Sequence, residues 1–288
     1  MSHRFTRPAW RRRAVAAGTT AAGVVGLAGA LLSPQAAQAA ALPTVSVAVT
    51  PSSISVSGAL QSGGVNVVTT DTGVKEAVVI FVALKPGATP AEVIAFGESK
   101  HAKDPNNASK FGSIVFDGEA EAGVKSEAQT TLAPGQYVVL LKAGEKPPSA
   151  HTTFTVSASN APATLPAPAA TERSIDFAFR GPSVLHDGEL VRFENEGFVV
   201  HMDFAIPTKS KKAAKQLVAA LLSGKEKQAQ KLFSGAPVGF DGPLSTGAYM
   251  QETITAKPGW YVQACFMETQ DGRDHARLGM ERIIQIVK

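Results

Sequence analysis

Residues 258–265, Pro-Gly-Trp-Tyr-Val-Gln-Ala-Cys, repeat the pattern of an earlier stretch, Pro134-Gly-Gln-Tyr-Val138, at an offset of 124 residues. The same offset places Phe116-Asp117-Gly118 on Phe240-Asp241-Gly242. Glycines and Pro-Gly pairs mark turns between strands, so shared turn positions predict a shared order of strands. We therefore interpret the two halves of the chain as copies of one domain.

Each half contains short β-rich runs that are interrupted by a helical stretch. The runs expected to form strands are 45–49, 65–69, 77–84, 136–142 and 151–156 in the first half, and 175–179, 190–194, 199–206, 260–266 and 282–287 in the second. Helical patterns cover residues 89–96 and 210–232, the second with Ser210 as N-cap and Gly224 as a helix stop. Many short strands between Gly and Pro turns predict an all-β fold, with two tandem Greek-key β-sandwich domains that each carry a short helical insertion.

The first 39 residues have the composition of a secretory signal peptide. A basic start is followed by an Ala/Gly/Val/Leu stretch from Ala14 to Leu32 and by the small-residue exit Ala37-Gln38-Ala39. The consecutive arginines and the glycine-diluted apolar stretch resemble a twin-arginine leader, with ordinary secretion as the alternative route. We therefore expect the mature protein to be secreted or extracytoplasmic.

A Pro/Ala/Thr-rich segment divides the remaining chain. It lacks an apolar period, as expected for a semi-rigid linker. The sequence therefore predicts an N-terminal domain at residues 44–156, a linker at 157–173 and a C-terminal domain at 174–288. No apolar run after the leader is long enough to span a bilayer, so we expect no transmembrane segment in the mature chain.

The charge of the chain depends on its leader. The whole chain has a net charge of +4 and a pI of about 9.1. Five basic residues lie in the leader, namely Arg4, Arg7, Arg11, Arg12 and Arg13. Without them 23 basic and 24 acidic residues remain, which gives a net charge of −1. A protein this close to neutral offers no compositional argument for nucleic-acid binding, so we expect no nucleic acid as a partner.

Four side chains in the second half combine nitrogen and sulfur donors. His201 follows the turn at Asn195-Glu-Gly197, Cys265 ends the stretch quoted above, and His275 and Met280 follow on a later loop. Cys265 is the one cysteine of the chain, so in an oxidising compartment it has no intramolecular partner. A thiolate and two imidazoles in a trigonal plane, with a weak axial thioether, form the ligand set of blue-copper sites.

The order and spacing of these residues resemble the cupredoxin family, the relatives of plastocyanin and azurin. The resemblance covers residues 174–288 directly and residues 44–156 only through the duplication. It implies cupredoxin-like domains and a single type 1 copper ion as cofactor. By this resemblance the copper ligands are His201, Cys265, His275 and Met280, and Asn195 ties the ligand loops together. Nine residues separate Cys265 from His275, which is longer than in the small soluble carriers and closer to the loops of larger copper enzymes.

The first half lacks this ligand set. At the common offset Ala77, Leu141 and Val156 take the places of His201, Cys265 and Met280, and His151 takes the place of His275. We therefore predict a cupredoxin-like N-terminal domain without the metal ligands.

These features predict a copper protein for electron transfer or copper handling outside the cytoplasm. No second histidine cluster suited to oxygen or nitrite chemistry is visible, so an electron carrier or binding protein is favoured over an enzyme. Lysines along the second helical stretch are expected to steer an acidic redox partner or to rest on an anionic cell-envelope surface. The lysines are Lys209, Lys211, Lys212 and Lys215.

Taken singly, each candidate ligand also has a structural interpretation. Cys265 and Met280 are typical core residues, and the two histidines suit a strand edge and a loop. The alternative is therefore a metal-free cupredoxin-like extracytoplasmic binding or structural module. A hydrolase that pairs Cys265 with His275, and the histidine with Asp271 or Asp274, lacks a supporting nucleophile motif.

Overall fold

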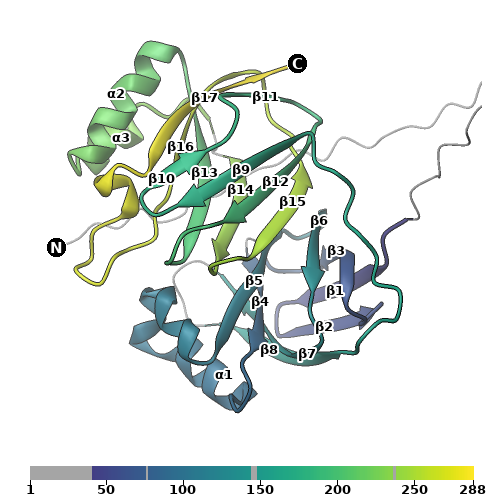
Figure 1. Cartoon of the computed structure of the whole chain (residues 1–288). Coiled ribbons are helices and arrows are strands. Elements are labelled where there is room, and N and C mark those ends of the chain that lie inside the picture. The colour runs from purple at the N-terminus through teal and green to yellow at the C-terminus, as the bar shows by residue number, and fades with distance from the viewer. Residues whose placement is uncertain (1–40, 76, 144–147, 236–237) are drawn as a thin grey trace, which may run out of the picture.

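The computed structural model describes residues 41–75, 77–143, 148–235 and 238–288 (Figure 1). The signal peptide expected at residues 1–39 lies outside the described residues. The elements of the first half are β1 (Thr44–Thr50), β2 (Ser53–Gly58), β3 (Gly63–Asp71), β4 (Ala77–Leu84), α1 (Pro90–Glu98), the 3-10 helices η1 (Lys100–Lys103) and η2 (Pro105–Lys110), β5 (Gly112–Ala120), β6 (Lys125–Leu132), β7 (Gly135–Lys142) and β8 (Ala150–Val156).

The elements of the second half are β9 (Ala170–Ile175), β10 (Ala178–Arg180), β11 (Val184–His186), β12 (Leu190–Asn195), β13 (His201–Thr208), α2 (Lys211–Leu222), α3 (Glu226–Gln230), β14 (Val238–Leu244), β15 (Tyr249–Thr253), β16 (Gly259–Ala264), the 3-10 helix η3 (His275–Leu278) and β17 (Glu281–Val287). Among the described residues, no helix has the length and the apolar character that crossing a membrane requires.

The two halves repeat one arrangement of strands. In the first half one layer has the order β2, β1, β3, β6 and the other the order β5, β4, β7, β8. In the second half the orders are β10, β9, β12, β15 and β14, β13, β16, β17, with β11 added beside β17. The parallel pair β1 and β3 recurs as β9 and β12. The chain is therefore an all-β protein of two sandwiches, in agreement with the fold expected from the turn spacing.

The two sandwiches are joined along an edge. β6 and β15 pair, so one layer from each half merges into an eight-stranded sheet (Figure 1). At this junction Gln251 Nε2 donates to Gln129 Oε1 at 2.9 Å. β5 and β14 also lie against each other, and a Cβ atom at Gly242 would overlap the carboxylate of Asp117. The two halves are thus in close contact through backbone and side chains.

A helix covers the outer face of one layer in each half. In the second half α2 packs Leu217 and Leu221 against Ile206 of β13 and Val262 of β16. This cover explains why β13 is buried on both faces, whereas β1 alternates between buried and exposed residues. Each fully buried aliphatic side chain of this kind stabilises the fold by roughly 1.5–3 kcal/mol.

Both helices begin where the sequence predicts. Thr89 forms a reciprocal capping box with Glu92 at the start of α1, and Ser210 Oγ accepts a hydrogen bond from Ala213 N at the start of α2. Gly224 follows α2 with a left-handed φ of 61°, and the short helix α3 comes next. Helix ends of this kind can be predicted because the side chains that bond to the backbone of the first turn are close to that turn in sequence.

The β-rich run 175–179 does not form the single strand expected for it. β9 ends at Ile175 and β10 begins at Ala178, so Asp176 and Phe177 form a two-residue turn between paired strands. Phe177 has a φ of 59°, a left-handed conformation that is uncommon for a bulky residue and that apolar patterning does not reveal. The turn carries Asp176 to the candidate metal centre.

Beyond β16 the two halves no longer correspond at the offset of 124 residues. His151 pairs with β7 at the position where Glu281 pairs with β16. The predicted match of His151 with His275 is therefore wrong, because the connection between β16 and β17 is longer than the one between β7 and β8. The same shift removes the match of Val156 with Met280.

The segment expected to be a linker packs against the first half. Gly64 N donates to Ala163 O at 2.6 Å, and Leu165 is buried. β9 already begins at Ala170, inside the range 157–173 assigned to the linker. The segment is thus a packed connection rather than a free spacer, while the domain limits themselves stay a prediction.

Candidate metal centre

Three elements of the second half bring candidate ligands to one end of the sandwich. His201 is the first residue of β13, Cys265 directly follows β16, and His275 is the first residue of η3. β13 and β16 are antiparallel neighbours, and Met202 N donates to Cys265 Sγ at 3.5 Å. The loop after β16 folds back on itself, since His275 N donates to Met267 O at 2.8 Å. Backbone pairing therefore brings together side chains that are far apart in sequence.

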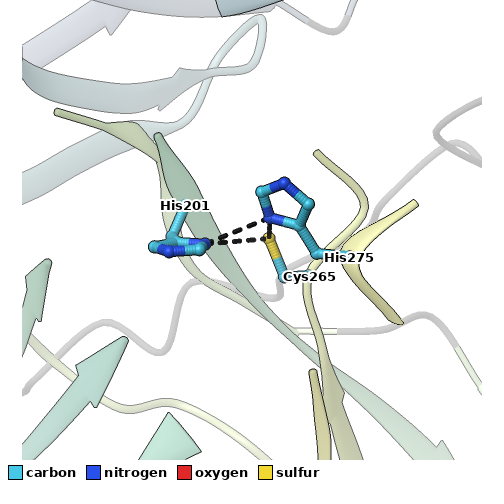
Figure 2. A group of neighbouring side chains, drawn as sticks. All are labelled: His201, Cys265 and His275. Carbon is cyan, nitrogen blue, oxygen red and sulfur yellow. Dashed lines mark hydrogen bonds between the residues drawn. The ribbon is translucent and has the colours of Figure 1, made fainter. Parts of the chain in front are cut away.

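The donor atoms of these three side chains face one another (Figure 2). His201 Nδ1 lies 3.1 Å from His275 Nδ1, and Cys265 Sγ lies 3.8 Å from His201 Nδ1 and 3.4 Å from His275 Nδ1. Nitrogen and sulfur donors about 2.0 to 2.3 Å from one ion are separated by about 3.3 to 3.7 Å in tetrahedral or trigonal geometry. One of the three observed distances lies in this range and the other two lie within about 0.2 Å of it, so small shifts of the side chains would place two imidazoles and a thiolate around one metal ion.

The centre is closed to solvent. His201 and His275 are each 1% exposed, and Cys265 is 0% exposed. Burial, followed by repulsion from His201, lowers the pKa of His275 to about 4, against smaller opposing effects of Asp176 and Asp104. Burial also lowers the pKa of His201, against the opposing effect of Asp176. Both imidazoles are therefore neutral at pH 7, which is the form that binds a metal ion.

Met280 lies in the same buried cluster as Cys265 and is 0% exposed. The other buried members of that cluster are Phe179, Met202 and Phe204. Met280 also closes the ligand loop, because Cys265 N donates to Met280 O at 3.2 Å and Met280 N donates to His275 O at 3.0 Å. His201, Cys265, His275 and Met280 thus form a type 1 copper-like site.

Asn195 links the two segments that flank His201. Its Nδ2 donates to the carbonyls of Val199 and Leu244, each at 2.8 Å, and its Oδ1 accepts from Gly197 N at 2.9 Å. Leu244 lies opposite His201 in the ladder of β13 and β14. The Asn195 side chain is buried, so these bonds are made inside the protein. Asn195 thus ties the segment before His201 to the end of β14, whereas a link to the loop that carries Cys265, His275 and Met280 stays a prediction.

Sequence reasoning missed Asp176. Its Oδ1 lies 3.3 Å from His201 Nε2 and accepts from Phe198 N at 2.9 Å. A carboxylate on the far nitrogen of a metal-binding histidine fixes the tautomer and the ring orientation. Gly197 leaves room for this contact, because a Cβ atom there would lie 2.6 Å from Asp176 Oδ1 and 2.7 Å from His201 Nε2. No motif marks Asp176, which precedes His201 by 25 residues within an expected strand.

The lysines expected to dock a partner are all exposed at the start of α2. They are Lys209, Lys211, Lys212 and Lys215. Lys211 Nζ lies 4.8 Å from the ring centroid of Trp260. On its inner side α2 packs Leu221 into the same buried cluster as Ala276 of η3. The lysine-bearing helix and the loop that carries His275 are thus packed on each other.

The geometry does not favour a cysteine hydrolase. A nucleophilic thiol must reach its substrate, but Cys265 is fully buried and its sulfur faces two imidazoles. The carboxylate of Asp271 accepts from Arg273 Nε at 2.7 Å on the surface of the loop. The carboxylate that does reach the centre is Asp176, and it contacts the other histidine.

No protein-family model and no curated protein matches the sequence. Among solved structures, the chain is similar to auracyanin A, a blue copper protein from Chloroflexus aurantiacus, at 17% identity over 41% of this chain and 96% of that chain, with a TM-score of 0.25. It is similar to an azurin from Methylomonas sp. strain J at 12% identity over 41% of this chain and 98% of that chain, with a TM-score of 0.26. It is also similar to a copper-containing nitrite reductase from Thermus scotoductus at 9% identity over 85% of this chain and 61% of that chain, with a TM-score of 0.22.

These neighbours are cupredoxins and a copper enzyme, the group that the ligand motif resembles. They include both small blue copper proteins and a reductase, so they leave open whether the chain is an enzyme.

Proposed function

We propose that this protein binds a single copper ion in its second half and serves in electron transfer or copper handling. The observation that carries the proposal is the convergence of His201 Nδ1, His275 Nδ1 and Cys265 Sγ in a buried centre with no pair more than 3.8 Å apart. One thiolate with two imidazoles is a donor set that suits copper, and the buried Met280 beside them would supply a thioether as a fourth donor.

Copper, when bound, supplies one-electron redox chemistry. The chain keeps both imidazoles neutral and excludes water from the donor atoms. Met202 N donates a hydrogen bond to Cys265 Sγ, which stabilises negative charge on the sulfur and so tunes the reduction potential. Donors that are already close together need little rearrangement when the charge of the ion changes. A closed centre of this kind suits electron transfer better than a reaction that needs an open coordination position.

We further propose that the protein works outside the cytoplasm and meets an acidic redox protein through the lysines of α2. The composition of the leader supports the first part, and the exposed lysines beside the His275 loop support the second. Association measured over a range of ionic strength tests the docking, because screening weakens attraction between exposed charges. A rate that does not change with salt would show that the lysines are only a solvated surface.

A copper titration of the purified mature protein tests the proposed function. Adding cupric ion is expected to produce an intense thiolate-to-copper absorption with one equivalent bound. Cys265→Ser is expected to abolish that absorption, whereas His186→Ala, which changes an exposed histidine outside the centre, is expected to retain it. A colourless wild-type protein with a freely titratable thiol would contradict the proposal and would support the metal-free binding module.

A further inference from the structure

The end of the second half that carries the candidate metal centre contacts the first half. Asn106, in η2 of the first half, accepts a hydrogen bond at Oδ1 from Val200 N, at 2.6 Å. Nearby, Ser245 N donates to Ile114 O and Ile114 N donates to Ser245 Oγ, both at 2.9 Å. Val200 directly precedes His201 in the chain. The first half therefore contacts the backbone beside the candidate ligand.

Asn195, in the core of the second half, bonds to the two segments that contain Val200 and Ser245. Its amide donates to the carbonyls of Val199 and Leu244, the neighbours of Val200 and Ser245. His201 lies between these anchors, since it follows Val200 and pairs with Leu244. Its backbone is thus fixed from the core of the second half and, independently, from the first half.

The Asn106 side chain is itself held in place. Asp104 caps η2, and its Oδ1 accepts from Asn106 N at 3.0 Å and from Asn106 Nδ2 at 2.9 Å. Because the amide nitrogen is bound to Asp104, the amide oxygen is left to face Val200 N. The neighbouring Asn107 differs, since its Nδ2 bonds back to Asp104 O and Asp104 Oδ2 within the first half. Replacing Asn106 therefore removes a contact with the second half, whereas replacing Asn107 removes hydrogen bonds within the first half.

We propose that the first half acts as a lid on the metal centre, with Asn106 as the positioning residue that clamps the His201 segment. This inference deepens the proposed function and rests on it for the role of the centre, but not for the closure of the centre. The clamp keeps His201 aimed at Cys265 and His275, and it keeps solvent from the sulfur. It also gives the half without metal ligands a definite role.

The reaction of the Cys265 thiol with Ellman's reagent in the metal-free full-length mature protein tests the lid. The signal is unambiguous because the chain has one cysteine. Asn106→Ala is expected to raise the labelling rate about five- to tenfold, the change that the loss of one hydrogen bond produces. Asn107→Ala is the matched control and is expected to label at the wild-type rate. Ser245→Ala, which removes the Oγ acceptor of Ile114 N, is expected to raise the rate as well.

Two further measurements separate the clamp from general destabilisation. Urea unfolding of Asn106→Ala and Asn107→Ala is expected to give similar midpoints, and in the copper-loaded form Asn106→Ala is expected to lose copper to a chelator about five- to tenfold faster. Equal labelling rates for the two asparagine variants would overturn the lid. Labelling rates that rise only in the variants with a lower urea midpoint, and in step with that midpoint, would also overturn it. If the wild type binds no copper, the proposed function fails, while the labelling experiment still decides whether the lid exists.

Discussion

Asp176 Oδ1 lies 3.3 Å from His201 Nε2, on the side of the ring opposite to the Nδ1 atom that faces Cys265. A hydrogen bond at Nε2 leaves the proton there and the lone pair at Nδ1, directed at the centre. The turn at residues 176–177 therefore determines which nitrogen of His201 is available to a metal ion.

Removing this carboxylate is expected to weaken copper binding. Asp176→Ala deletes the acceptor at His201 Nε2, and loss of such an outer partner lowers metal affinity by about 10- to 100-fold. Asp176→Asn keeps an acceptor oxygen without the charge, so its affinity is expected to lie between those of Asp176→Ala and the wild type. Competition titration with a copper chelator measures all three. Equal affinity in Asp176→Ala and the wild type would exclude a role for the carboxylate.

A side chain at Gly197 is expected to push His201 away from the centre. The added Cβ of Gly197→Ala would meet both the Asp176 carboxylate and the His201 ring. We expect a loss of about 1–3 kcal/mol in the free energy of unfolding, as for other overpacked sites, together with weaker copper binding. Gly259→Ala is the control, because its Cβ would come no closer than 3.7 Å to a neighbour. The explanation fails if both variants behave alike in urea unfolding and copper titration.

Asn195→Ala is expected to destabilise the protein strongly. The substitution removes three hydrogen bonds from a site that is 1% exposed and leaves the carbonyls of Val199 and Leu244 without this donor. We expect the free energy of unfolding to fall by about 2–4 kcal/mol in the metal-free protein. Urea denaturation measures the change, with Asn66→Ala at an exposed hydrogen bond to Glu127 as control. A loss no larger than in the control would mean that Asn195 does not hold the segment before His201 against the end of β14.

Met280→Leu tests whether Met280 would serve as a copper ligand or only fills the core. The exchange is close to isosteric and is expected to change the free energy of unfolding by less than about 1.5 kcal/mol. Three donors remain, so the thiolate-to-copper absorption is expected to persist. The reduction potential is expected to rise, because the thioether no longer donates electron density that favours the oxidised ion. Voltammetry measures the shift, and an unchanged potential would show that Met280 is only a core residue.

Glu172 is expected to make stability depend on pH. This side chain is 1% exposed and contacts Arg282 and Gln263. Burial raises the pKa of Glu172 to about 7, against the opposing attraction of Arg282. The folded state therefore holds a proton more tightly than the unfolded chain, whose glutamate pKa is near 4.5. The contribution of this group to stability is thus complete below about pH 4.5 and is lost as the pH rises through about 7.

Glu172→Gln removes this proton equilibrium. The free energy of unfolding of the wild type, minus that of the variant, is expected to decrease by on the order of 1–3 kcal/mol between about pH 5 and about pH 8. Urea unfolding at several pH values measures the difference, and groups that titrate in both proteins cancel from it. A difference that is constant with pH would contradict the raised pKa.

The local parts of the fold could be read from the chain. The offset of 124 residues places β4 on β13 residue for residue, and both helix starts follow from capping residues next to them. The ligand positions His201 and Cys265 lie within or beside these repeated strands. They could be compared with Ala77 and Leu141 of the first half because turns recur at the same spacing there.

The expectations that failed depend on backbone geometry or on loop length. The turn at Asp176 and Phe177 interrupts an apolar run without a glycine or proline to mark it. The longer connection after β16 shifts β17 relative to β8, so the match of His151 with His275 does not hold. A constant offset between the two halves no longer aligns their residues once a loop differs in length. The pattern of apolar residues, in turn, does not indicate which residue has a left-handed backbone.

Sequence alone determined the all-β class, the repeat of the two halves, the starts of α1 and α2 and the set of nitrogen and sulfur donors, because each of these depends on residues close along the chain or on a regular repeat. The tertiary structure alone decided that Asp176 meets His201 and that Asn106 of one half holds Val200 of the other. Those contacts join segments that only strand pairing and the packing of the two halves bring together. No local pattern encodes them, since the energy of each contact exists only after the chain has folded.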